Sequence, residues 1–232
     1  MIYSNIHEGI FIDRPNRFIA NVLISGVSTV CHVKNTGRCR ELLIPGTKVL
    51  LEKSSNPARK TQYDLVKVYK GDRLVNLDSN APNIVFGEFL RSGGLGFKTE
   101  YVKAEFTHGD SRFDYYFEHE GKKAFAEVKG VTLEENNVAR FPDAPTERGI
   151  KHLKGLIDCV RQGYEAYAVF IIQMRGIDTF SPAWDKHREF ALTLCQAHEA
   201  GVKILAFDCD VTENGLNIAE PIKVDLIEKA QD

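Results

Sequence analysis

The sequence contains, in close succession, Ser111-Arg-Phe-Asp-Tyr-Tyr-Phe117 and Ala124-Phe-Ala-Glu-Val-Lys-Gly-Val131, separated by a short polar turn. Both stretches are rich in aromatic and β-branched residues and are bounded by turn residues, which is typical of strands. Side chains alternate between faces along a strand, so Glu127 and Lys129 are expected to point the same way. A hairpin between the two strands would bring Asp114 to that same face.

Two carboxylates and one lysine at one place suit metal-dependent cleavage of a phosphodiester bond. Asp114 and Glu127 would hold Mg²⁺ or Mn²⁺ through oxygen, the ligand that hard cations prefer. Such a cation generates hydroxide and neutralises charge on the scissile phosphate. Lys129 would orient the attacking water or stabilise developing negative charge. The alternative is an ordinary surface salt bridge, because Glu/Lys pairs on strands are common.

The residues around this group favour the functional interpretation. Ala124, Ala126 and Val128 are apolar, which predicts that the opposite face of the strand is buried. The strand continues into Gly130-Val-Thr-Leu133, as a central strand would. Charged side chains inside a sheet cost free energy unless they are paired or bind a metal.

Composition limits the class of protein. The chain has 232 residues, of which 43% are hydrophobic, and this suits one large globular domain or two small ones. No apolar run approaches the ~20 residues of a membrane span, and the N-terminal stretch has no basic and apolar regions of a signal peptide. The five cysteines form no C-x-x-C pair, which indicates reduced thiols. We therefore expect a cytoplasmic protein without a membrane partner.

Charge is distributed unevenly along the chain. Residues 1–80 carry 12 Lys and Arg against 7 Asp and Glu, whereas the remainder carries 18 against 25. A basic first part beside an acidic second part suggests that the first binds a polyanion and the second holds cations. Chance variation in surface charge is the simpler alternative.

The first part of the chain is expected to be all β, with the boundary near residue 80 dividing it into domains 1–80 and 81–232. Five strands in about seventy residues fit a small barrel of the oligonucleotide-binding (OB) type. A short helix is expected at residues 40–44, between the second and third strands. The expected strands cover residues 17–24, 28–33, 47–53, 62–70 and 73–77.

The second part alternates helices and strands, which predicts an α/β layered fold with a mixed sheet. A very apolar strand at 166–173 is expected to be buried on both faces. The other elements are helices near 83–92, 146–162 and 185–200, and strands near 98–107, 111–118, 123–133 and 202–207.

A basic turn in the first part is a candidate phosphate-binding site. Asn35-Thr36-Gly37 is expected to form a tight turn with exposed backbone amides, surrounded by basic residues in the sequence. A plain basic surface turn is an equally good interpretation. With a second basic pair in the following loop, the nucleic-acid-binding candidates are Lys34, Asn35, Thr36, Gly37, Arg38, Arg40, Arg59 and Lys60.

Two helices of the second part offer further candidates. The helix that begins after Thr146 would present Arg148 and His152 to a phosphate near the acidic site, unless this is merely a solvated helix face. Glu88, on the first helix, is a candidate third carboxylate for the metal, although a lone helical glutamate is more often a surface residue. The sequence has no Walker loop, G-x-S-x-G or G-x-G-x-x-G, so no nucleotide cofactor is expected.

At these residues the chain resembles the sugar fermentation stimulation protein A family over nearly its whole length. The resemblance implies an OB-type barrel followed by a domain like the PD-(D/E)XK nucleases, DNA binding, and an association with regulating sugar (maltose) metabolism genes in bacteria. It also implies that Asp114 and Glu127 hold the metal and that Lys129 is the catalytic lysine, with Phe113 where the nuclease pattern has proline. The motifs are His32-x-x-Asn-Thr-Gly37 with Pro45-Gly46 downstream, Ser111-Arg-Phe-Asp114, Glu127-Val-Lys-Gly-Val-Thr-Leu133 and Phe141-Pro-Asp-Ala-x-Thr-Glu-Arg-Gly-x-x-His-Leu153.

Two functions follow from these observations. One is a DNA-binding protein that cleaves DNA with the help of a divalent metal. The other is a non-catalytic DNA-binding regulator that uses the nuclease fold as a platform. Both predict DNA affinity that falls with salt, because phosphate contacts release counterions. A protein-interaction module, the third class, predicts no such binding. The sequence leaves the oligomeric state open.

Overall fold

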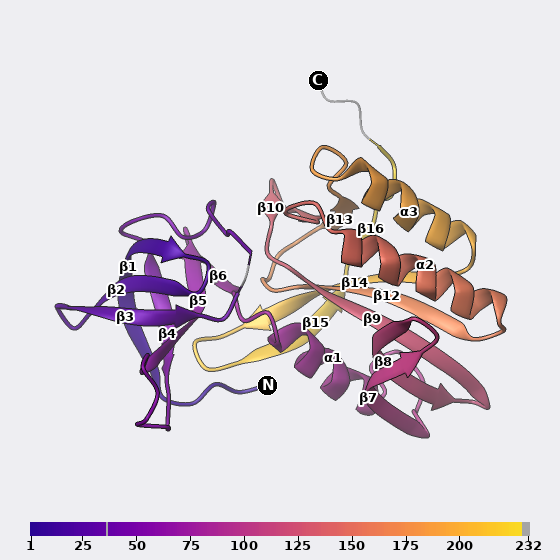
Figure 1. The fold of residues 1–232 in the computed structure, drawn as a ribbon, viewed down its shortest axis with the longest axis horizontal. Helices are drawn as coiled ribbons and strands as arrows, with labels where there is room; N and C mark the ends of the chain where they lie inside the picture. The colour runs from indigo at the N-terminus through magenta and orange to yellow at the C-terminus, as the bar shows by residue number, and fades with distance from the viewer. Residues whose placement is uncertain (36, 229–232) are drawn as a thin grey trace.

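The chain folds into a β-barrel followed by a layered α/β part, as the computed structural model of residues 1–35 and 37–228 shows (Figure 1). The strands of the first sheet follow the order β3-β2-β1-β4-β5-β6, and an additional pairing of β3 with β5 closes a five-stranded barrel. The predicted OB-type barrel is therefore confirmed. Its strands are β1 (Ile6–Asn16), β2 (Ile19–Ile24), β3 (Val27–Val33), β4 (Lys48–Lys53) and β5 (Tyr63–Lys70).

Two details of the barrel were predicted wrongly. The barrel begins with β1, which was not predicted because its apolar stretch is short and lies between charged residues. The fifth predicted strand, 73–77, is instead β6 (Arg73–Asn76), which forms a hairpin with β5 and is not one of the five barrel strands. Residues 40–44 form a turn, in which the amides of Leu42 and Leu43 donate to the Cys39 carbonyl. Pro45 follows directly and disfavours a helical conformation before it.

The second part is a six-stranded mixed sheet between two helical layers. Strands β9, β12 and β14 are parallel neighbours in its centre, whereas β8, β7 and β15 pair antiparallel at the edges. Helix α1 packs on one face, and α2 and α3 pack on the other (Figure 1). The elements are α1 (Ala81–Arg91), β7 (Tyr101–His108), β8 (Ser111–His119), β9 (Lys122–Val131), α2 (Glu147–Arg161), β12 (Glu165–Ile172), α3 (Arg188–Glu199), β14 (Lys203–Val211) and β15 (Leu216–Pro221).

A small additional sheet was not predicted. Its strands are two to four residues long, too short for any alternation of apolar and polar side chains to be recognised. Of the helices described, none combines the length and the apolar composition that a membrane crossing requires. The small sheet consists of β10 (Glu134–Glu135), β11 (Val138–Phe141), β13 (Thr179–Pro182) and β16 (Lys223–Val224).

Polar contacts hold the barrel against the second part. Lys67 of β5 is fully buried, and its Nζ donates to the carbonyl oxygens of Thr212 and Glu213, each at 2.8 Å. Lys70 Nζ binds Glu134 Oε2 at 2.6 Å, and Arg73 also pairs with that carboxylate. These contacts come from adjacent strands, so they fix how the barrel sits on the sheet.

Replacing Lys67 with methionine is expected to remove a pH dependence of stability. Burial lowers the pKa of Lys67 to about 8, although the charges of Glu52 and Glu213 oppose the shift. Between about pH 8 and the ordinary value of 10.5 the unfolded chain binds more protons than the folded chain, so stability from this group rises with pH. The free energy of unfolding of the wild type, relative to Lys67→Met, should increase by on the order of 2 kcal/mol between pH 7 and 10. Denaturant unfolding at both pH values measures this, and a constant difference would contradict it.

Candidate active site between the sheet and helix α2

Asp114 lies where two strands separate. The β8–β9 ladder runs from His119 paired with Lys122 to Tyr115 paired with Ala126. Beyond this pair a side chain replaces the backbone acceptor of the ladder: Asp114 Oδ2 accepts a hydrogen bond from the Val128 backbone amide at 2.7 Å. From α1, the Asn83 side-chain amide donates to Asp114 Oδ1 at 2.9 Å. The carboxylate is thus held from two sides.

Glu127 lies on the neighbouring strand and is 3% exposed. Its Oε1 accepts hydrogen bonds from Lys129 Nζ, at 2.5 Å, and from His152 Nδ1. Its Oε2 is buried and has no hydrogen-bond partner within the described part of the chain. A buried carboxylate oxygen without a partner is costly, and a cation bound there would supply the missing partner.

Helix α2 contributes His152 to this group. Thr146 caps the helix by accepting a hydrogen bond from the Gly149 amide at 3.0 Å, which fixes the residue at which the helix starts and thereby the position of His152 within it. His152 is buried, and its Nε2 accepts from Arg148 Nε at 3.5 Å while Nδ1 faces Glu127. His152 therefore holds Glu127, and Arg148 lies behind it with an exposed side chain.

The two carboxyl groups differ in acidity. Burial, together with the adjacent charge of Glu127, raises the pKa of Asp114. Burial also opposes ionisation of Glu127, yet hydrogen bonds from His152 and Lys129 outweigh it and hold the pKa of Glu127 below its ordinary value. A half-buried and a buried acid that repel each other, one of them with an oxygen that has no partner among the described residues, fit a divalent cation.

Glu88 does not join this group, contrary to the sequence-based expectation. Its side chain is 54% exposed, and its Oε2 accepts a hydrogen bond from the Met1 amine at 2.7 Å. The residue of α1 that reaches the site is Asn83, five positions earlier. Sequence reasoning missed Asn83 because it lies in a polar, turn-prone stretch at the helix start.

Some basic side chains near the turn at residues 34–40 and in the next loop form ion pairs within the fold, and others are exposed without one among the described residues. Lys34 Nζ binds the buried carboxylate of Asp78 at 2.8 Å, and Arg59 makes a bidentate pair with Asp64 at 2.8 and 2.7 Å. Both cations are therefore committed within the fold. The exposed side chains of Arg38, Arg40 and Lys60 form no ion pair with any described residue.

Arg14, which the sequence did not single out, organises this turn. Its guanidinium donates to the carbonyl oxygens of Asn35, Gly37 and Arg38 at 2.6 to 2.8 Å. Asn35 Oδ1 accepts from the Gly37 amide at 2.7 Å, so that amide is not available to a phosphate. Thr36 lies outside the described residues.

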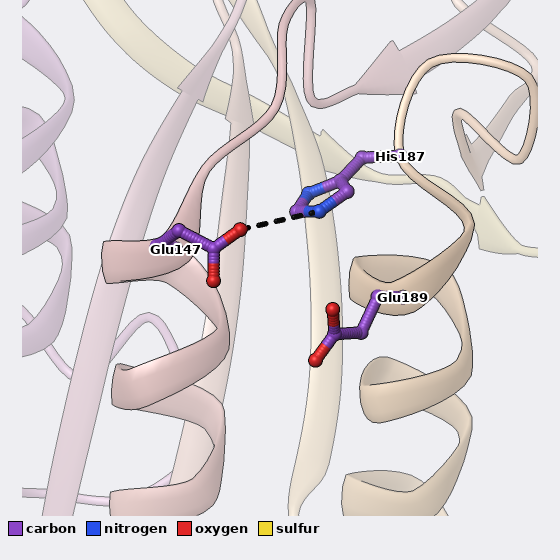
Figure 2. Close-up of side chains that lie close together, drawn as sticks. All are labelled: Glu147, His187 and Glu189. Carbon is purple, nitrogen blue, oxygen red and sulfur yellow. Dashed lines mark ion pairs between the residues drawn. The ribbon is translucent and has the colours of Figure 1, made fainter.

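A second group of possible ligands lies at the starts of α2 and α3. Glu147, His187 and Glu189 bring ligand atoms within 4.8 Å of one another, and Figure 2 shows Glu147 and His187 facing each other. The Thr146 amide donates to His187 Nδ1 at 3.2 Å, so the neutral ring carries its proton on Nε2, the atom that faces Glu147 at 3.7 Å. A metal on Nε2 would have to displace that proton, so this group is better explained as acidic residues at two helix N-termini.

The chain is similar to known protein families along most of its length. The model of the sugar fermentation stimulation protein RE domain matches residues 80–215, and that of the SfsA N-terminal OB domain matches residues 12–77. A sugar fermentation stimulation protein homolog of Ruminiclostridium cellulolyticum is 54% identical over 97% of this chain and 100% of its own length. A homolog of Desulfitobacterium hafniense is 55% identical over 98% of this chain and 100% of its own.

A solved structure agrees with these matches. The structure of Pyrococcus furiosus SfsA in complex with Ca²⁺ superposes with a TM-score of 0.86 and 29% identity, covering 97% of this chain and 98% of the other. Both family models and the full-length relatives lead to the same assignment. The chain therefore belongs to the sugar fermentation stimulation protein family.

Proposed function

We propose that this chain binds DNA and cleaves its phosphodiester bonds in a reaction that requires a divalent metal. The observation that carries the proposal is the group formed by buried Glu127 with half-buried Asp114 and Lys129, in which Glu127 Oε2 has no partner among the described residues. Two acids and a lysine in a sheet would be costly as a purely structural arrangement.

Each residue has a role that its contacts suggest. Asp114 and Glu127 would hold Mg²⁺ or Mn²⁺, which when bound supplies a water of lowered pKa and charge neutralisation at the phosphate. Lys129 Nζ, partly exposed and next to Glu127, donates toward the reacting phosphate and stabilises negative charge that develops there. Asn83 and His152 keep the two carboxylates in place through Asp114 Oδ1 and Glu127 Oε1.

Two further observations support the proposal. The related Pyrococcus furiosus SfsA was solved in complex with Ca²⁺, a cation that prefers the same carboxylate oxygens as Mg²⁺. The OB-type barrel next to the site belongs to a class that binds oligonucleotides, and Arg38 and Arg40 are exposed on it. We expect these two arginines, with Lys60, to contact the DNA backbone.

The test is cleavage of end-labelled single-stranded, duplex and branched DNA by the whole protein with Mg²⁺ or Mn²⁺. Cleavage is expected with metal and is expected to stop when a chelator is added. Binding without cleavage of every substrate would overturn the catalytic part and favour the non-catalytic regulator of sugar metabolism genes. Absence of any salt-dependent DNA binding would overturn both.

A further inference from the structure

A cleft of about 360 Å³ lies between the barrel and the second part. Gly37 and Arg38 of the basic turn line one wall. Gly130, which directly follows the candidate catalytic Lys129, lines the other, together with Arg140 and Gln173. The cleft thus begins one residue beyond Lys129 along β9 and extends to the basic turn of the barrel.

Gln173 presents a hydrogen-bond donor whose direction is fixed by the barrel. The Tyr3 hydroxyl donates to Asn76 Oδ1 at 2.9 Å, so the Asn76 amide group must use its NH₂ to donate to Gln173 Oε1, at 2.7 Å. The Gln173 NH₂ then points the other way. Gln173 is 1% exposed, and its Nε2 has no acceptor among residues 1–35 and 37–228.

This donor lies on the floor of the cleft beside the backbone of β9. A Cβ at Gly130 would be 3.1 Å from Gln173 Nε2 and 2.7 Å from Pro82, so only glycine leaves the Nε2 position undisturbed. An amide donor that faces the cleft and has no acceptor within the described part of the chain must bond to water or to a ligand there. The atom that enters the cleft should therefore be a hydrogen-bond acceptor.

The cleft wall adds charge of both signs. Arg38 is exposed and has no ion pair among the described residues, whereas Arg140 is committed to Glu135 and Asp185. The exposed carboxylate of Asp143 approaches within 3.1 Å of where a Cβ at Gly37 would lie. A ligand with an anionic group for Arg38, an acceptor for Gln173 and a donor for Asp143 matches a nucleotide better than a bare phosphate.

We propose that the cleft binds an unpaired nucleotide next to the scissile phosphate, so that the protein selects single-stranded DNA. This inference rests on the proposed function and specifies its substrate. A nucleotide must expose its pairing edge to meet both Gln173 and Asp143, which a base pair prevents. The cleft is as small as a typical small-molecule site, about 300–1,000 Å³.

The cleft also cannot widen easily to admit a duplex. The backbone N–H of Asn76 donates to the backbone carbonyl of Gln173 at 2.9 Å, and the backbone N–H of Gln173 donates to the backbone carbonyl of Val131 at 2.9 Å. These bonds join β6 of the barrel to the ends of β12 and β9. OB-type barrels, moreover, commonly bind single strands.

The test compares Gln173→Glu with the wild type in binding a labelled oligothymidine of about 12 nucleotides, within the site size of an OB fold, and a duplex of the same length. A chelator is present so that no cleavage occurs. Glutamate can still accept from Asn76, but its second oxygen repels the acceptor of the nucleotide. The wild type should bind the single strand more tightly, and Gln173→Glu should lower that affinity about tenfold or more while changing duplex affinity less than about twofold.

Arg38→Ala tests the barrel side of the cleft, and this exposed residue takes no part in the hydrogen bonds among Tyr3, Asn76 and Gln173. It should flatten the salt dependence of single-strand binding by about 0.7 in logarithmic slope, the value of one phosphate contact. Lys123→Ala, which removes an exposed positive charge at the opposite end of β9 from the cleft, should leave single-strand selection intact. Thermal unfolding checks that Gln173→Glu is folded.

The outcomes separate the cleft from the proposed catalysis. Equal wild-type affinity for single strand and duplex, or unchanged single-strand binding by folded Gln173→Glu and by Arg38→Ala, would overturn the cleft inference while leaving metal-dependent cleavage intact. Loss of single-strand binding in both variants, without cleavage by the wild type, would support the strand-binding cleft and overturn only catalysis.

Discussion

Replacing Glu127 with glutamine is expected to lower the rate of metal-dependent DNA cleavage by on the order of a thousandfold. Glutamine has nearly the same volume and can still accept from Lys129 Nζ, so the packing around it should be preserved. What is lost is the negative charge that would hold the cation. Initial cleavage rates at saturating Mg²⁺ measure the first effect, and calorimetric titration with Ca²⁺ measures loss of cation binding independently of activity.

Lys129→Met is the matched control for this prediction. It should reduce cleavage to a similar extent but retain Ca²⁺ binding, because removing a positive charge beside Glu127 lowers repulsion of the cation. Single-strand and duplex binding should change less than about threefold in Glu127→Gln, since the charge lies deep in the site. Near-normal cleavage by Glu127→Gln, or loss of Ca²⁺ binding in Lys129→Met alone, would contradict these roles.

The sequence predicted the elements whose side chains follow a clear period. Strand β12 is apolar at nearly every position, as a strand covered on both faces should be, and α2 carries an apolar stripe along one side. The hairpin of β8 and β9 followed from two β-rich stretches around a short turn, and it brings Asp114 and Glu127 close together. Local patterns were sufficient there because the pairing partners are adjacent in sequence.

What the sequence did not reveal depends on contacts between distant segments. Glu88 and Asn83 are both polar residues of α1, and only the packing of that helix on the sheet decides which one faces Asp114. Lys34 and Arg59 resemble phosphate ligands in the sequence, yet each has a carboxylate partner within the fold. The orientation of the Gln173 side-chain amide is set by its hydrogen bond with Asn76, which is 97 positions away in the chain.

Gly87→Ala is expected to lower the free energy of unfolding by on the order of 2 kcal/mol, although alanine favours a helix by about 1 kcal/mol over glycine. Gly87 lies on the face of α1 that packs against β8, and a Cβ there would be 2.3 Å from the Tyr115 hydroxyl oxygen and 2.9 Å from Arg91 Nη1. Real Cβ atoms do not approach so closely, so α1 must move away from the sheet. Denaturant unfolding measures the loss.

The same displacement should reach the candidate active site, because Tyr115 donates to the Asn83 carbonyl at 2.7 Å and the Asn83 side chain donates to Asp114. Cleavage by Gly87→Ala should therefore fall by about tenfold or more, as for other losses of support around a metal ligand. Tyr115→Phe removes the closest atom of the clash but costs about 1 kcal/mol through the lost hydrogen bond. In the double variant the two losses should be less than additive by about 1 kcal/mol, since loss of the hydroxyl relieves the closest contact, although the ring carbon Cζ stays 2.9 Å from the new Cβ. Additive losses would mean that α1 accommodates the methyl group without pressing on Tyr115, and the proposed path from Gly87 to Asp114 would then be wrong.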